Sequence, residues 1–192
     1  MKAKSLLAFT AVVALFLTAC NEPSYINNPG DNSFNTDSIP MPEPSPDPEG
    51  VTIPEGTINV TQAYNIGKKL QQSDKDHKYP TAETYYIKGW VRNFDEKERA
   101  KADFEDKFNQ YGNDYVYLSA RQDGAGTKAF YCYRILGREG AKLPNHDVLQ
   151  IGDFVVVKCK ILNFSGTIEN DGTCSIEVSN NPLYNEAFPA AN

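Results

Sequence analysis

The sequence predicts a mainly β protein, a five-stranded Greek-key barrel preceded by an α-helix, on a disordered N-terminal tether. Three observations indicate this class. Apolar residues alternate with polar ones in five short segments after residue 84, which is typical of half-buried strands. A segment with helical spacing precedes them, and proline dominates the stretch before that helix.

The five expected strands are short and are separated by turns or polar links. They lie at 84–92, 114–120, 128–135, from 152 onward, and 173–178. The side chains on the apolar face of these strands would point into the barrel; they are Ile87, Val91, Val116, Leu118, Val155, Val157 and Ile161. Five strands with a long irregular link before the fourth fit a small barrel better than a sandwich, which usually has seven or more.

Two segments outside the strands have helical periodicity. Residues 60–70 place their apolar side chains on one face, and Thr57 or Asn59 is a suitable N-cap. Residues 95–110 form a charged insertion between the first two strands, and Phe104, Phe108 and Tyr111 at its end fall at i, i+4 and i+7. We therefore expect a short amphipathic helix in this insertion.

The N-terminus has the three parts of an export signal. Lys2 and Lys4 are followed by an apolar run and then by small residues that end at Cys20. This pattern resembles a bacterial lipoprotein signal, so residues 1–19 would be removed and Cys20 would carry the lipid. No other part of the sequence approaches the roughly 20 apolar residues that a spanning helix needs.

Residues 20–56 are expected to form a lipidated, proline-rich, acidic tether. Eight of the twelve prolines lie there, and they disfavour both helix and sheet. The stretch 21–56 also holds seven acidic residues and no basic one. We interpret it as a semi-rigid spacer; the alternative is a recognition ligand for an aromatic groove.

The folded part, 57–192, is expected to be one domain that is almost neutral. The chain carries a formal charge of −6, but from Thr57 onward there are 17 Lys and Arg against 18 Asp and Glu. A sequence-independent nucleic-acid binder relies on a clear positive excess. The charge balance therefore favours a glycan or protein ligand over a nucleic acid.

Aromatic and basic residues alternate on the outward phase of the expected strands. These candidate ligand-binding residues are Tyr86, Lys88, Trp90, Arg92, Tyr115, Tyr117, Tyr131, Tyr133, Lys158 and Lys160. Interleaved aromatic and basic side chains form stacking platforms for single-stranded bases, and flat amphipathic rings also suit sugars. The alternative is that the charged insertion or the N-terminal helix covers the rings. Trp90, the only tryptophan, is expected to be exposed.

Catalytic and metal-binding patterns are missing from the sequence. His77 and His146 lack a second histidine at ligand spacing, and we find no established catalytic motif. We therefore expect no enzymatic activity, no metal and no cofactor. Cys132, Cys159 and Cys174 are expected to be buried free thiols, although a Cys159–Cys174 bridge across the last hairpin stays open.

Several stretches together resemble the OB-fold domain of exported Bacteroidetes lipoproteins. They are Gly56-Thr57 with the helix, Tyr85–Val91, Tyr111–Asn113, Tyr115–Ser119, Phe130–Arg134, Ile151–Val157 and Leu162–Gly166. The resemblance implies an OB barrel with a general ligand-binding role and no enzymatic activity. Ala120 departs from it, because the family usually has an aspartate there. Asp37-Ser38-Ile39 is similar to the O-glycosylation sequon of that phylum, which makes Ser38 a candidate acceptor.

These observations predict an outer-membrane lipoprotein, slightly favouring the cell surface over the periplasmic face. Its barrel would be a monomeric, non-catalytic module that engages an extended polymer, either a glycan or a single-stranded nucleic acid. The alternative is an interaction or structural subunit of an envelope protein complex, docked through the same aromatic face.

Overall fold

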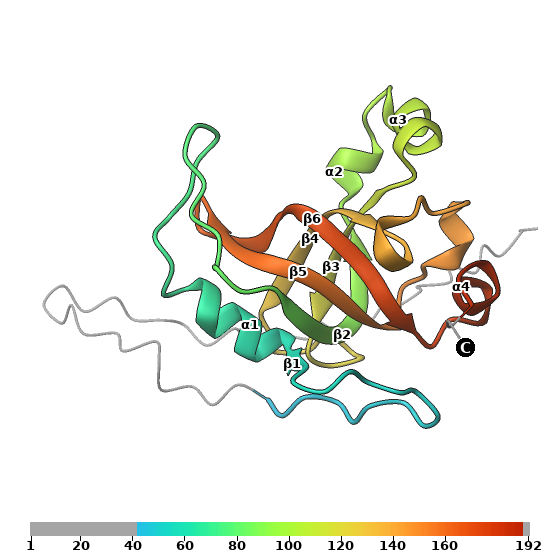
Figure 1. The fold of residues 1–192 in the computed structure, drawn as a ribbon, viewed down its shortest axis with the longest axis horizontal. Helices are drawn as coiled ribbons and strands as arrows, with labels where there is room; N and C mark the ends of the chain where they lie inside the picture. Colours follow the sequence, from blue (N-terminus) through green and yellow to red (C-terminus); the bar gives the residue numbers. More distant parts are fainter. Residues whose placement is uncertain (1–41, 190–192) are drawn as a thin grey trace, which may run out of the picture. The chain divides into compact units, whose positions relative to one another are not determined.

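The computed structural model describes residues 42–189, which form a closed five-stranded β-barrel with one further strand outside it (Figure 1). The barrel strands are β2 (Tyr85–Phe94), β3 (Asp114–Ser119), β4 (Ala129–Leu136), β5 (Phe154–Phe164) and β6 (Thr167–Ser179). The outside strand, β1 (Ile58–Asn59), pairs in parallel with β2. The predicted fold class, a mainly β protein with a five-stranded barrel preceded by a helix, is confirmed.

The barrel closes in the strand order β2–β3–β4–β6–β5, with β5 returning to β2. All of these pairs are antiparallel except β4 with β6, which is parallel. The β5–β6 hairpin is the longest pairing, and its last strand begins at Thr167, earlier than the sequence predicted. The loop between the first helix and β2 follows the tip of this hairpin, because the backbone of Ser73 bonds to Asn163 and Ser165.

Residues 42–189 also form four short α-helices and two 3-10 helices. They are α1 (Val60–Gly67), α2 (Glu96–Arg99), α3 (Phe104–Tyr111), α4 (Pro182–Ala187), η2 (Arg138–Gly140) and η3 (His146–Val148). Asn59 caps α1 in a reciprocal capping box with Gln62, as one of the two expected caps. α2 and α3 lie in the insertion between β2 and β3. No helix within residues 42–189 is long and apolar enough to cross a bilayer.

The barrel interior holds the main hydrophobic core. The seven residues expected to fill it are all completely buried. A second, smaller cluster of Trp90, Phe154 and Val156 lies on the outside of the barrel, where these residues alternate with the inward ones. The sequence therefore predicted the inside of the barrel correctly, and it did not anticipate an apolar cluster outside it.

Residues 42–53, which we call the strap, cover that outer cluster. Val51 and Ile53 pack against it, so the folded unit already includes residues that precede Thr57. The expected boundary between tether and domain at residue 57 therefore falls inside the folded unit. The expected lipidation site Cys20 and glycosylation candidate Ser38 lie outside the described residues.

Candidate ligand-binding groove

A concave site of about 400 Å³ lies at one end of the β3–β4 outer face, and we call it the tyrosine groove. It is lined by Lys75, Lys78, Asp95, Glu98, Tyr131, Tyr133, Phe164, Glu169 and Gly172. These residues come from four places: the loop after α1, the insertion, strand β4 and the β5–β6 hairpin. The barrel thus brings segments that are distant in sequence to one site.

Four tyrosines on the outer face of β3 and β4 form the wall of the groove and its support. Tyr117 and Tyr131 are stacked with ring centroids 4.6 Å apart, and Tyr133 lies 6.2 Å from Tyr131. The Tyr115 ring packs edge to face on the Tyr133 ring, with centroids 5.4 Å apart. Tyr115 is itself buried against Phe104 of α3. The insertion therefore covers Tyr115, and Tyr131 and Tyr133 are the rings that reach the groove.

Asp95 fixes the tyrosine wall to the insertion. Its carboxylate accepts hydrogen bonds from the hydroxyls of Tyr131 at 2.8 Å and Tyr117 at 3.4 Å. The same carboxylate caps α2 by accepting from the N–H groups of Lys97 and Glu98. Burial would raise the pKa of Asp95, but these hydrogen bonds outweigh it and hold the pKa below its ordinary value. Burial and the contact with Asp95 raise the pKa of Tyr131.

The insertion is held to the barrel by a buried ion pair. The guanidinium of Arg99 binds both carboxylate oxygens of Asp114, at 3.1 and 2.5 Å, and the Asp114 side chain is only 2% exposed. The same guanidinium lies 3.5 Å above the ring of Phe94. Two charged hydrogen bonds in a fork are stronger and more specific than a single one. This pair keeps α2, and with it Asp95 and Glu98, at the edge of the groove.

Asn170 positions the backbone of Tyr133. The β4–β6 register shifts between Tyr131 and Ile135, which interrupts the ladder there. The buried amide of Asn170 fills the gap by accepting from the Tyr133 N–H at 2.6 Å and donating to the Tyr133 carbonyl at 3.1 Å. Arg134 follows with φ 58°, a left-handed conformation that is strained for arginine, and its guanidinium lies 5.0 Å from the Tyr133 ring.

The charged side chains of the groove have mixed signs. Lys75 and Lys78 line the groove together with the three carboxyl groups of Asp95, Glu98 and Glu169. Burial raises the pKa of Glu169 to about 7, so this carboxyl is partly protonated near neutrality. The groove therefore offers both donors and acceptors, and it has no positive excess.

The strap covers one part of the predicted ligand-binding face. Trp90 lies outside the barrel as expected, but it is only 6% exposed, so the prediction of an exposed indole is wrong. The physical reason is the strap, which packs Val51 and Ile53 over Trp90 and Tyr86. Lys88 beside them is paired with Asp47 of the strap.

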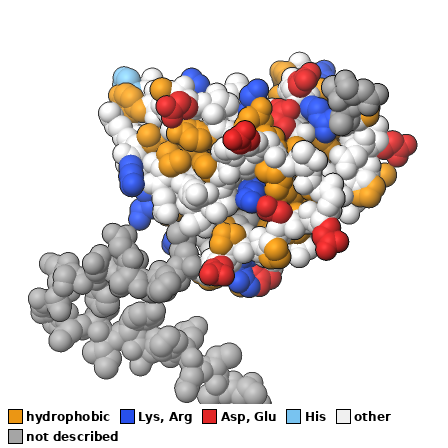
Figure 2. All heavy atoms as spheres, turned by 60° about the horizontal axis from the view of Figure 1, so that its bottom comes forward, with side chains coloured by type: hydrophobic (Ala, Val, Ile, Leu, Met, Phe, Trp, Pro, Cys, Tyr) orange, Lys and Arg blue, Asp and Glu red, His pale blue; other side chains and the backbone are white. Residues whose placement is uncertain are grey.

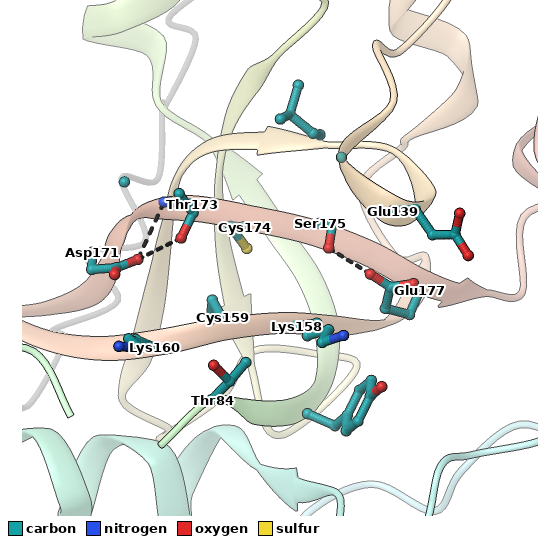
Figure 3. A pocket seen from close by; sticks show the side chains of 14 residues that line it. Thr84, Glu139, Lys158, Cys159, Lys160, Asp171, Thr173, Cys174, Ser175 and Glu177 are labelled. Carbon is teal, nitrogen blue, oxygen red and sulfur yellow. Dashed lines mark hydrogen bonds between the residues drawn. The ribbon is translucent and has the colours of Figure 1, made fainter. Parts of the chain in front are cut away.

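The remaining basic candidates lie away from the tyrosine groove. Arg92 lies against Gly124 in the β3–β4 turn. Lys158 and Lys160 line a shallow cavity of about 750 Å³ on β5 and β6, together with Thr173, Ser175 and Glu177 (Figure 3). The ammonium group of Lys158 lies 5.7 Å from the Tyr86 ring. The structure therefore separates the ten candidates, and Tyr131 and Tyr133 alone among them line the groove.

The three cysteines of the described part carry free thiols and are buried inside the barrel, as expected. Cys159 and Cys174 are directly opposite each other on β5 and β6, the position that a bridge across the last hairpin would need. Burial raises the pKa of Cys132, and contact with Cys174 together with burial raises that of Cys159. Within residues 42–189 no group of His, Cys, Asp and Glu is arranged to hold a metal ion.

The most informative groove residues other than the tyrosines were not predicted. Asp95 and Glu98 fall in the charged insertion, and Asn170 precedes the last expected strand at 173–178. A signal for Asp95 was available, because an aspartate just after a strand and before Glu96 is a good N-cap. No local signal marks Lys75, Lys78 or Glu169.

Fold and site together define a small closed β-barrel protein with a tyrosine-walled groove of mixed charge. Comparisons with protein-family models, with curated proteins and with solved structures each found no match to this chain. The ligand of this chain must therefore be inferred from the groove itself.

Proposed function

We propose that this chain is a non-catalytic binding protein whose barrel takes an extended glycan in the tyrosine groove. The observation that carries the proposal is the combination of the Tyr131 and Tyr133 rings with carboxylates and lysines in one concavity. Flat amphipathic rings suit the apolar faces of sugars, and mixed donors and acceptors suit their hydroxyls. The proposal includes anchoring through a lipid on Cys20, in the manner of the exported OB-fold lipoproteins that the sequence resembles.

The position of the groove supports this proposal. Barrels of the OB type bind oligonucleotides and oligosaccharides across their second and third strands and two neighbouring loops. Here the second and third barrel strands are β3 and β4, and the neighbouring elements are the insertion and the β5–β6 hairpin. Likeness of architecture is weak evidence for function by itself, so the ligand class has to come from the chemistry of the groove.

Charge favours a glycan over a single-stranded nucleic acid. The groove contains three carboxyl groups and two lysines, so a phosphate backbone would meet repulsion from Asp95, whereas Glu98 is paired with Lys101 at 2.6 Å. The face in Figure 2 also shows acidic and basic side chains interspersed, without a broad region of one sign. Nucleic-acid binders usually present a continuous basic surface.

A glycan array followed by calorimetric titration of the mature chain tests the proposal, with single-stranded DNA titrated in parallel. We expect saturable binding to an oligosaccharide and no binding to DNA at physiological salt. Asp95→Asn should weaken glycan binding, since that carboxylate holds the Tyr131 and Tyr117 hydroxyls. Asp147→Asn, at an exposed position of η3, should leave glycan binding unchanged.

Two outcomes would overturn the glycan assignment. Tighter binding of DNA, increased further by Asp95→Asn, would identify the groove as a nucleic-acid site. Capture of one stoichiometric envelope protein, with no glycan bound, would favour the interaction-subunit alternative.

A further inference from the structure

The outer face of β2 and β5 carries an apolar cluster that is separate from the tyrosine groove. Trp90 and Phe154 meet edge to face there, with ring centroids 5.3 Å apart, and Val156 completes the cluster. These residues point away from the barrel core, so the barrel does not need them for its own interior packing. A large aromatic cluster on an outer sheet face requires a partner to exclude water.

The strap is the partner that the structure shows on this face. It carries Pro42, Pro44, Pro46 and Pro48 and has neither helix nor strand along this run. The Ser45 N–H donates to the Ala120 carbonyl at 3.0 Å, and the Gln122 N–H donates to the Ser45 hydroxyl at 3.0 Å. After a turn at Glu49 and Gly50, Val51 and Ile53 return over the cluster. Figure 1 shows this segment as the blue-to-cyan loop along the bottom of the view.

Charge complements these contacts. Asp47 of the strap pairs with Lys88 of β2 at 2.5 Å, and both side chains are about one third exposed. Glu49 lines a cavity of about 410 Å³ together with Arg138, at the end of β6. An Nη1 atom of Arg138 is buried there without a hydrogen-bond partner. The strap therefore forms one ion pair with β2, and a second of its acidic residues lines the same cavity as Arg138.

We propose that the outer face of β2 and β5 is a peptide-binding site for an extended, proline-rich, acidic segment, and that the strap is its intramolecular ligand. Val51 and Ile53 make the apolar contacts with the cluster, and the prolines before them keep the segment extended, which reduces the entropy lost on binding. Covalent linkage gives the strap a high effective concentration, on the order of millimolar, so it excludes other peptides from the site. This inference does not depend on the glycan proposal.

The single tryptophan gives a direct test. A protease site is inserted at the exposed turn of Glu55 and Gly56 in the mature chain, which is folded first and then cut. The uncut protein should show blue-shifted Trp90 emission that iodide does not quench. After cutting and removal of the fragment the emission should shift to the red, and a synthetic peptide of residues 42–56 should restore it with saturation.

Peptide variants distinguish recognition from nonspecific covering. Replacing Val51 and Ile53 by serine in the peptide should abolish the recovery. A peptide with Asp47→Lys should bind about threefold more weakly, the effect of one partly exposed ion pair. The Asp47→Lys peptide should bind more tightly again to the cleaved protein when that protein carries Lys88→Asp.

Far-UV and near-UV circular dichroism accompany each step. Emission that stays blue after the fragment has been removed would overturn the proposal, because the strap would then not be what covers Trp90. Loss of near-UV structure that the peptide does not reverse would also overturn it, because the strap would be an ordinary part of the folding unit.

Discussion

Replacing Asn170 by alanine removes the bridge that holds the backbone of Tyr133. The main-chain N–H of Tyr133 would lose its acceptor, the Asn170 Oδ1 at 2.6 Å. The main-chain carbonyl of Tyr133 would lose its donor, the Asn170 Nδ2 at 3.1 Å. An unsatisfied buried polar group costs about 1–3 kcal/mol. Because Tyr133 is half-buried, water can satisfy part of this loss. We expect the free energy of unfolding to fall by about 2–4 kcal/mol, with weaker ligand binding as Tyr133 shifts.

Urea unfolding followed by circular dichroism measures this change, with Asn163→Ala as the matched control. Asn163 is also an asparagine of the β5–β6 hairpin, but its side chain only accepts from the Gly166 N–H in an exposed turn at 3.1 Å. We expect the control to lose less than about 1 kcal/mol. Asn170→Asp should resemble alanine at neutral pH and recover as the pH falls, because a protonated carboxyl can again donate. Equal losses for Asn170→Ala and Asn163→Ala would refute the bridging role.

Three further predictions concern the interior, the groove and the outer cluster. Cys132, Cys159 and Cys174 should resist a maleimide reagent in the native protein, and all three should react in denaturant; the mass of a disulfide between any two of them would contradict this. Because the pKa of Glu169 rises from 4.5 to about 7 on folding, the free energy of unfolding should fall as the pH rises through that interval. Glu169→Gln should flatten this dependence in denaturant titrations at several pH values, and an unchanged pH profile would contradict the burial argument. Trp90→Ala should cost about 3–5 kcal/mol in urea unfolding, as a buried tryptophan does, whereas a loss below about 1 kcal/mol would mean that the strap does not bury it.

Local patterns predicted the barrel well. The alternation in β2, β3 and β5 predicted the inward residues correctly, because the side-chain period of a strand is read from neighbouring positions. The Asn59 cap and the buried Phe104 and Phe108 of the insertion helix followed from equally local rules. The first part of β6 lies before the expected start at Thr173, because the polar run Glu169, Asn170 and Asp171 breaks the apolar alternation.

Long-range placement was not predictable from the same patterns. The proline content of the strap indicated an extended segment, but nothing in its sequence specified that Val51 and Ile53 would cover Trp90. That docking reversed the expected exposure of the indole. The junction of Asp95 with Tyr131 likewise joins residues 36 positions apart, which the topology of the barrel brings together.

The central claim is that the tyrosine groove binds the ligand, and a comparison of two tyrosine variants tests it most directly. Tyr133→Ala removes a ring that lines the groove, whereas Tyr111→Ala removes a half-exposed ring at the end of α3, which does not line it. Both are titrated by calorimetry with the oligosaccharide selected on the array. We predict a loss of affinity of about tenfold for Tyr133→Ala, the order of magnitude of one aromatic stacking contact, and no change for Tyr111→Ala. Unchanged affinity in a folded Tyr133→Ala protein would contradict the assignment of the groove as the binding site.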